Sequence, residues 1–147
     1  PDKESYQIIS EHNLQDVHFV GPVSYNELPR YYQLADIFCA PNTGKESFGL
    51  VLLEAMAART PIVATSIEGF ASVLHHGAEG LLVPPQDEEA LATCLELLVN
   101  DPDLRMKLGA QGALTAEEFH WPRVAAQVMD YYQTLLERKQ TVSAPNL

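Results

Sequence analysis

Two glutamates stand eight residues apart in the stretch PNTGKESFGLVLLEAM, at positions 46 and 54. Glu46 follows small and turn-forming residues, whereas Glu54 lies inside an apolar run that predicts a helix. A helix rises about 1.5 Å per residue, so the separation is on the order of 10 Å, about the span from a sugar ring across a diphosphate to a ribose. Carboxylates accept hydrogen bonds from vicinal hydroxyls well. The spacing therefore suits a nucleotide sugar, with Glu54 at the ribose and Glu46 at the sugar.

The residues between the two carboxylates predict an anion site. The amides of Phe48, Gly49 and Leu50 are expected to be the unpaired first donors of the helix, at the positive end of its dipole. Gly49 would let a phosphate approach without a Cβ in the way. Ser47 is small, which lets the backbone approach a ligand. Lys45, the only cation of the loop, either faces the phosphates of the donor or is solvated.

A purely structural interpretation fits the same spacing. A carboxylate at position 46 is favoured simply because it lies near a helix N-terminus, and Glu54 would then be a solvent-facing helical residue. One pair of glutamates at this spacing leaves both interpretations open.

The surrounding sequence alternates short apolar runs with helical stretches. Strands are predicted at 16–21, 36–41, 61–65 and 80–85, and helices at 27–35, 48–58, 69–76, 87–100, 101–119 and 121–139. Asp87 can cap the helix that it opens, and Pro102 stands in the allowed first turn of the next one. Apolar strands between helices favour a parallel sheet with helices on both faces, the doubly wound α/β class. Ligands of such sheets bind beyond the carboxyl ends of the strands, where the Glu46 loop lies.

Composition and charge exclude several classes of protein. The chain has 147 residues, 46% of them hydrophobic, which is enough for one domain with a core. A net charge of −11 argues against nucleic acid or an anionic lipid surface as a partner. No apolar run is long enough to span a membrane. The two cysteines, Cys39 and Cys94, are predicted to be packed thiols in a reducing, cytoplasmic setting, and no residues stand at metal-binding spacing.

The stretch PNTGKESFGLVLLEAMAARTPIVAT resembles the signature of the retaining glycosyltransferases of the GT-B fold, family 4 (group 1). It is similar to the phosphatidylinositol mannosyltransferase branch of that family. ESFGLVLLEAMAA, PIVA and the later GLLVPPQDEEAL follow in the family's order and spacing, and VHFVGPVSYNELPRYYQLADIFCAPN looks like the preceding segment. The resemblance covers nearly all of Pro1 to about Glu137.

This resemblance implies roles for individual residues. Glu46 would be the catalytic acidic residue beside the donor sugar, Glu54 would bind the ribose, and the amides of residues 48–50 would hold the sugar and the diphosphate. The stretch Val23–Ser24 lies where the nucleobase packs in the family. The resemblance also implies GDP-mannose as the donor, retention of the anomeric configuration, and no metal or other cofactor.

The chain departs from the family pattern at its start. The first two strand-helix stretches of the nucleotide domain, with their arginine and lysine for the diphosphate, and the acceptor-binding N-terminal domain are not in it. We expect a partial Rossmann-like domain over 1–120, a helix over 121–139 that would cross to the missing domain, and a frayed tail over 140–147. Arg59 replaces a usual glycine at a helix end where a left-handed residue is expected.

The missing strands would leave a gap between 16–21 and 36–41. Either the first of these strands slides next to the second, another copy of the chain fills the space in a homo-oligomer, or a piece of chain outside this sequence belongs there.

The expected function is the donor-binding domain of a hexosyltransferase that moves mannose to a lipid or saccharide acceptor. The full enzyme would be cytoplasmic or peripheral to the inner face of the cell membrane, and this chain alone would be inactive. Two alternatives remain, a non-catalytic nucleotide-sugar-fold domain that acts in assembly and a GT-B nucleotide-sugar epimerase.

Overall fold

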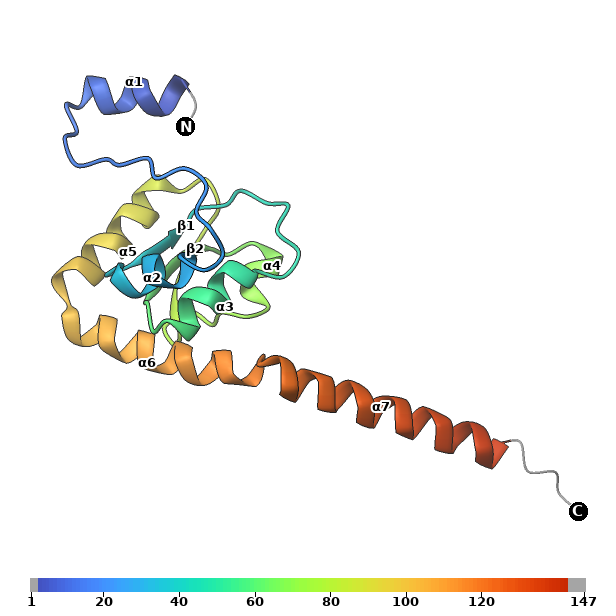
Figure 1. Cartoon of the computed structure of the whole chain (residues 1–147). Coiled ribbons are helices and arrows are strands. Elements are labelled where there is room, and N and C mark those ends of the chain that lie inside the picture. The colour runs from blue at the N-terminus through green and yellow to red at the C-terminus, as the bar shows by residue number, and fades with distance from the viewer. Residues whose placement is uncertain (1–2, 143–147) are drawn as a thin grey trace, which may run out of the picture.

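The computed structural model describes residues 3–142. Within that range three parallel strands form one sheet in the order β1-β2-β3, and helices cover both of its faces (Figure 1). The strands are β1 (Phe38–Ala40), β2 (Ile62–Thr65) and β3 (Gly80–Val83), and the helices are α1 (Lys3–Glu11), α2 (Leu28–Leu34), α3 (Leu50–Ala57), α4 (Glu68–Ala71), α5 (Glu88–Asn100), α6 (Pro102–Glu118) and α7 (Trp121–Val142).

The core consists of two apolar layers, one on each face of the sheet. All four residues of the central strand β2 are buried. Ile62 and Ala64 belong to a cluster with residues of α2, α3 and α4, whereas Val63 packs with Leu98 of α5 and Leu108 of α6. Successive side chains of a strand point to opposite faces, so this alternation buries both faces. The prediction of an α/β fold with helices on both faces of a parallel sheet is confirmed.

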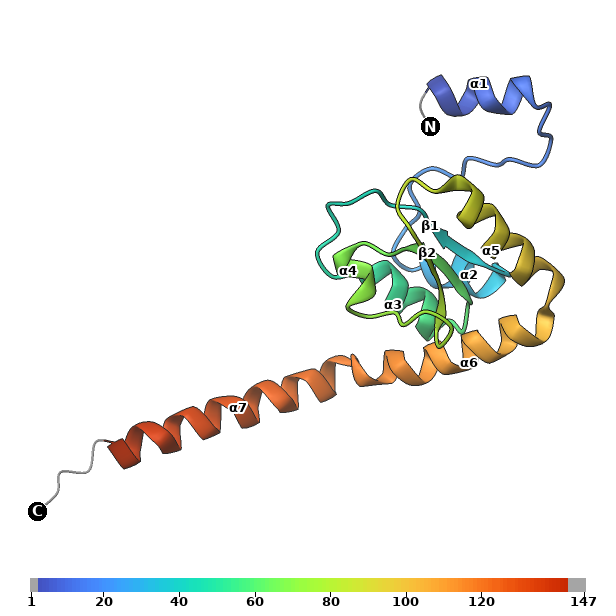
Figure 2. The same cartoon turned by 180° about the vertical axis from the view of Figure 1, so that it is seen from behind.

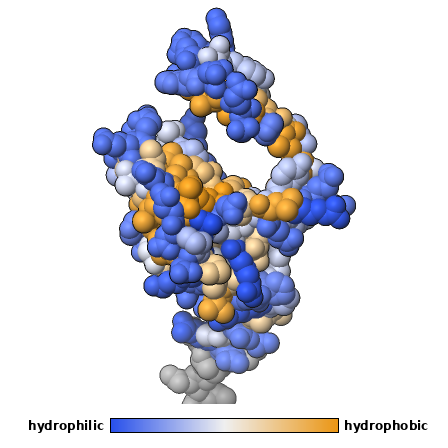
Figure 3. All heavy atoms as spheres, turned by 90° about the vertical axis from the view of Figure 1, so that its left-hand side faces the viewer, coloured by the Kyte–Doolittle hydropathy of each residue, from blue (hydrophilic) through white to orange (hydrophobic). Residues whose placement is uncertain are grey.

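The strand predicted at 16–21 is wrong. The strand β1 pairs with β2, and residues 16–21 are exposed and form no strand. Figures 1 and 2 show them as an extended connection between α1 and the body, and Figure 3 shows orange apolar atoms on this N-terminal part. A ladder needs a partner for its backbone groups, and the described residues offer none here. The segment therefore does not slide next to β1, and the other two ways to fill the gap stay predictions.

The predicted helix starts at 87 and 101 are confirmed by their caps. The Asp87 carboxylate accepts the Ala90 amide at 2.9 Å, and the Asp101 carboxylate accepts the Leu104 amide at 2.8 Å. Each carboxylate satisfies an amide that has no partner inside its own helix.

Two helices end elsewhere than predicted. The helix expected at 69–76 is α4, which ends at Ala71, and Val73 and Leu74 beyond its end are buried in the core. The last helix continues past 139 to Val142, and the rest of the predicted frayed tail, 143–147, lies outside the described residues.

None of the helices between residues 3 and 142 is long and apolar enough to cross a membrane.

Helix α3 ends in a Schellman turn. The Arg59 amide donates to the Met56 carbonyl at 2.9 Å, and the Thr60 amide donates to the Ala55 carbonyl at 3.0 Å. Arg59 has a φ of 63°, in the left-handed region that favours glycine. The expectation of a left-handed residue at this helix end is therefore confirmed, with an arginine in that conformation.

Replacing Arg59 with glycine is expected to raise the free energy of unfolding by about 0.5–1 kcal/mol, because glycine adopts a positive φ without a Cβ penalty. Urea denaturation measures the change. Arg59→Ala removes the same charge but keeps a Cβ, so it should bring no gain. An equal gain in both variants would contradict the backbone explanation.

Candidate nucleotide-sugar site

The Glu46 side chain folds back onto the start of α3. Its Oε1 atom accepts the Gly49 amide at 3.1 Å and the Phe48 amide at 3.4 Å. The helix itself begins at Leu50, with Gly49 as its N-cap residue. A carboxylate is favoured here because the first amides of a helix lack partners inside it and carry partial positive charge. The expectation of three unpaired amides is therefore wrong for Phe48 and Gly49, which Glu46 satisfies.

Two glycines allow the backbone to pack closely beneath this turn. Gly49 has a φ of 86°, and a Cβ on it would lie 3.0 Å from the ring of Phe70. A Cβ on Gly69 of α4 would clash with the carbonyl oxygen of Glu46 and lie 3.1 Å from the Phe48 nitrogen. Phe70 is fully buried and fixes α4 in the core. Residues 46–49, which we call the Glu46 turn, thus rest directly on α4, a contact that the sequence does not predict.

The loop before this turn is tied to the end of the neighbouring strand. The Thr65 hydroxyl donates to the Asn42 carbonyl at 2.5 Å, which holds the loop at the carboxyl end of the sheet, as predicted. Lys45 and Ser47 are exposed, and Lys45 has a left-handed φ of 65°. The contribution of these two side chains to donor binding stays a prediction.

Glu54 is partly buried and faces helix α2. The Tyr32 hydroxyl donates to Glu54 Oε2 at 3.0 Å, and the Tyr32 ring packs edge-on against Phe38 with centroids 5.2 Å apart. Burial, followed by the hydrogen bond to Glu54 and its charge, raises the pKa of Tyr32 to about 12. The phenol therefore keeps its proton at neutral pH. Glu54 is a carboxylate held by a core residue, not the solvent-facing position of the structural interpretation.

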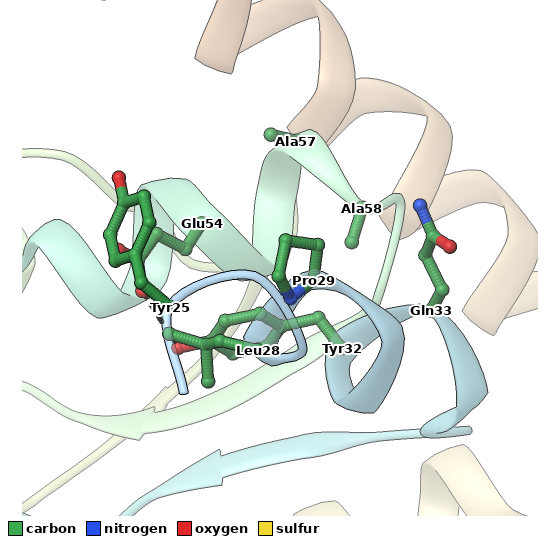
Figure 4. A pocket seen from close by; sticks show the side chains of 8 residues that line it. All are labelled: Tyr25, Leu28, Pro29, Tyr32, Gln33, Glu54, Ala57 and Ala58. Carbon is green, nitrogen blue, oxygen red and sulfur yellow. Dashed lines mark hydrogen bonds between the residues drawn. The ribbon is translucent and has the colours of Figure 1, made fainter. Parts of the chain in front are cut away.

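An open pocket of about 240 Å³ lies between α2 and α3 (Figure 4). It is lined by Tyr25, Leu28, Pro29, Tyr32, Gln33, Glu54, Ala57 and Ala58. Tyr25 is 84% exposed, and Figure 4 shows its ring, like Glu54, at the end of the pocket opposite Gln33. The pocket offers an apolar surface and an aromatic ring next to one carboxylate.

The residues predicted to lie at the nucleobase do not line this pocket. Val23 is partly buried, and the Ser24 hydroxyl donates to Glu27 Oε2 at 2.7 Å at the start of α2. Their neighbour Tyr25 lines the pocket instead. An aromatic residue in the polar turn SYNELP was the signal that could have pointed to it.

Both cysteines are free and partly buried. Burial raises the pKa of both Cys39 and Cys94, in agreement with their predicted role as packed thiols. Among residues 3–142, no three His, Cys, Asp or Glu side chains gather where they could hold a metal ion.

Comparison with known proteins identifies the family. The sequence profile described as "Glycosyl transferases group 1" matches residues 1–115, more than half of the chain. The chain belongs to the group 1 glycosyltransferases. The predicted family is thereby confirmed, and the parallel sheet with its Glu46 turn belongs to a group 1 domain.

Individual relatives agree with this assignment. The group 1 domain is 42% identical to the phosphatidyl-myo-inositol mannosyltransferase of Mycobacterium leprae over 122 residues. The aligned region covers 83% of this chain and 33% of that protein. Among solved structures it resembles sucrose-phosphate synthase from Thermosynechococcus elongatus, with a TM-score of 0.82, 35% identity, and coverage of 92% of this chain and 34% of the other. It also resembles Anabaena HepE in complex with UDP-glucose, with a TM-score of 0.80, 25% identity, and coverage of 90% and 36%.

The group 1 domain spans about a third of the length of these proteins. Because its structure resembles theirs, its fold is the α/β fold of GT-B glycosyltransferases.

Proposed function

We propose that this chain is the donor-binding domain of a retaining glycosyltransferase that takes mannose from GDP-mannose and transfers it to a lipid or saccharide acceptor. The donor would lie along α3, with its base and ribose in the Tyr25–Glu54 pocket and its diphosphate and sugar at the Glu46 turn. The names of the relatives support the reaction class: one is a mannosyltransferase and another was solved with UDP-glucose.

The observation on which this proposal rests is the position of Glu54 in the pocket. Glu54 is a partly buried carboxylate whose recorded partner is a neutral tyrosine, not a cation. A carboxylate has acceptor sites for several hydrogens, so it can take the two hydroxyls of a ribose in addition to the phenol. The exposed Tyr25 ring offers the base a stacking surface beside it.

The Glu46 turn supplies the chemistry at the other end of the donor. The Phe48 and Gly49 amides now bond to Glu46. When the donor binds, the carboxylate would turn away to accept hydroxyls of the sugar, and the amides would stabilise the charge that develops on the departing diphosphate. Glu46 is thus the proposed catalytic residue, and it moves with the donor.

Calorimetric titration of the 147-residue chain with GDP, UDP and ADP tests the proposal. We expect GDP to bind with a Kd in the millimolar range or below, and Glu54→Ala to weaken binding about tenfold or more, because a hydrogen bond to a charged group is lost. Glu96→Ala is the matched control, since Glu96 is exposed on α5 across the sheet. Tighter binding of UDP or ADP than of GDP would overturn the guanine assignment.

The same titration separates the proposal from the assembly alternative. A domain that acts only in assembly predicts no nucleotide response, and equal affinities in the wild type and Glu54→Ala would contradict a ribose role for Glu54. An epimerase would convert the nucleotide sugar without an acceptor. The chain spans a third of its Mycobacterium leprae relative, so we expect it to bind the donor but not to transfer the sugar by itself. We place the full enzyme in the cytoplasm or at the inner membrane face.

A further inference from the structure

We propose that Tyr32 is a positioning residue that makes the pocket selective for ribonucleotides over deoxyribonucleotides, by holding the Glu54 carboxylate in the orientation that a ribose requires. This inference rests on the proposed function, because it assumes that Glu54 faces the ribose. It concerns a buried residue that lines the pocket beside Glu54 and donates a hydrogen bond to it.

The Tyr32 hydroxyl determines how Glu54 is oriented. The Tyr32 hydroxyl donates to Glu54 Oε2 at 3.0 Å. Within residues 3–142, no lysine or arginine forms an ion pair with Glu54. A glutamate side chain has several rotatable bonds, so a carboxylate at the wall of an open pocket samples several rotamers unless a partner holds it. One bond at Oε2 leaves Oε1 as the acceptor for hydroxyls of a ligand.

Tyr32 is itself held firmly, so it can act as a fixed donor. Its side chain is buried, and its ring is packed against Phe38. Its backbone carbonyl accepts the Thr60 hydroxyl at 2.6 Å, which ties α2 to the segment after α3. The phenol remains protonated at neutral pH and therefore donates to Glu54.

A rigid carboxylate favours a ligand that offers two hydroxyls in a fixed relative position. The vicinal hydroxyls of ribose do so, whereas a 2′-deoxyribose offers one. Without the Tyr32 hydroxyl, Glu54 can rotate to suit a single hydroxyl, and part of the preference is lost.

The test compares GDP with 2′-deoxy-GDP, and UDP with 2′-deoxy-UDP, by calorimetry on the 147-residue chain. We expect the wild type to prefer the ribonucleotide about tenfold, as for one hydrogen bond to a charged group. Tyr32→Phe should reduce this ratio to about threefold or less. Phenylalanine keeps the ring contact with Phe38 and the backbone carbonyl that Thr60 uses, so the variant is expected to fold, and circular dichroism checks this.

Tyr31→Phe is the matched control, because Tyr31 is the neighbouring tyrosine of α2 and is 47% exposed. It should keep the wild-type ratio. A general loss of packing in Tyr32→Phe would weaken both nucleotides equally and leave the ratio unchanged, which would overturn the inference. In the Glu54→Ala background, Tyr32→Phe should have no further effect on the ratio.

The two failures can be told apart. A wild type that binds none of these nucleotides overturns the proposed function and the inference with it. A wild type that binds and prefers the ribonucleotide, with the same ratio in Tyr32→Phe, overturns the inference alone. A wild type without any ribose preference also overturns the inference, because Glu54 then does not read the two hydroxyls.

Discussion

Replacing Gly69 with alanine is expected to displace the Glu46 turn and to weaken nucleotide binding by at least tenfold. The new Cβ would clash with the carbonyl oxygen of Glu46 and approach the Phe48 nitrogen, and backbone atoms on both sides have little freedom to rotate away. Helix α4 is held by the buried Phe70, whereas residues 41–45 of the facing loop are exposed. The loop is therefore the side that yields, and it carries Glu46 and its amides with it.

The expected loss of stability in Gly69→Ala is about 1–3 kcal/mol, the usual range for an added methyl group in a packed site. Urea denaturation measures it, and titration with GDP measures the affinity. Ala71→Ser adds one atom to the exposed side of the same helix and should change neither. Wild-type affinity in Gly69→Ala would show that the contact between α4 and the turn does not position Glu46.

Gly109→Ala is expected to lower the free energy of unfolding by about 2 kcal/mol. Helix α6 packs on the end of α3 at this glycine, where a Cβ would clash with the Arg59 carbonyl oxygen and lie 3.0 Å from its carbon. The Schellman turn fixes that carbonyl, so overpacking should cost about 3 kcal/mol, the upper end of the usual range. Alanine offsets about 1 kcal/mol of this through its better helix propensity.

Gly112→Ala, one helical turn further along α6, gives the matched comparison. A Cβ there would meet the Met56 side chain, at 3.2 Å from Cγ, and a methionine can adjust its rotamer. The better helix propensity of alanine should then outweigh the cost of the contact. The free energy of unfolding of Gly112→Ala should stay unchanged or rise slightly. Equal losses of stability in Gly109→Ala and Gly112→Ala would contradict this explanation. It would then not matter whether the added Cβ meets a fixed backbone atom or a movable side chain.

The local features of the chain were predictable from the sequence. The Asp87 carboxylate caps its helix, and Arg59 adopts the left-handed conformation that the helix end demands. The apolar runs that became β1, β2 and β3 were read correctly, as was the carboxyl-end position of the Glu46 loop. These features depend on the residues themselves and on neighbours a few positions away.

The alternation of strand and helix also determined the fold class, because apolar strands between helices can be buried only inside a sheet covered on both faces. The pattern of motifs pointed to the family for a related reason, since several short segments recur in one order and spacing. The Glu46–Glu54 spacing also marked the stretch of chain that we propose as the site.

Tertiary structure decided what depends on partners far away in the sequence. The segment 16–21 has the composition of a strand, but in the described part of the chain it has no neighbouring strand, and so it stays extended and exposed. The Tyr32–Glu54 bond joins residues 22 positions apart, and the contact of Gly69 with the Glu46 turn crosses from α4. No periodicity or local propensity encodes such contacts. They arise because α2, α3 and α4 pack together on one face of the sheet. This packing brings Tyr32 within hydrogen-bonding distance of Glu54 and Gly69 into close contact with the Glu46 turn.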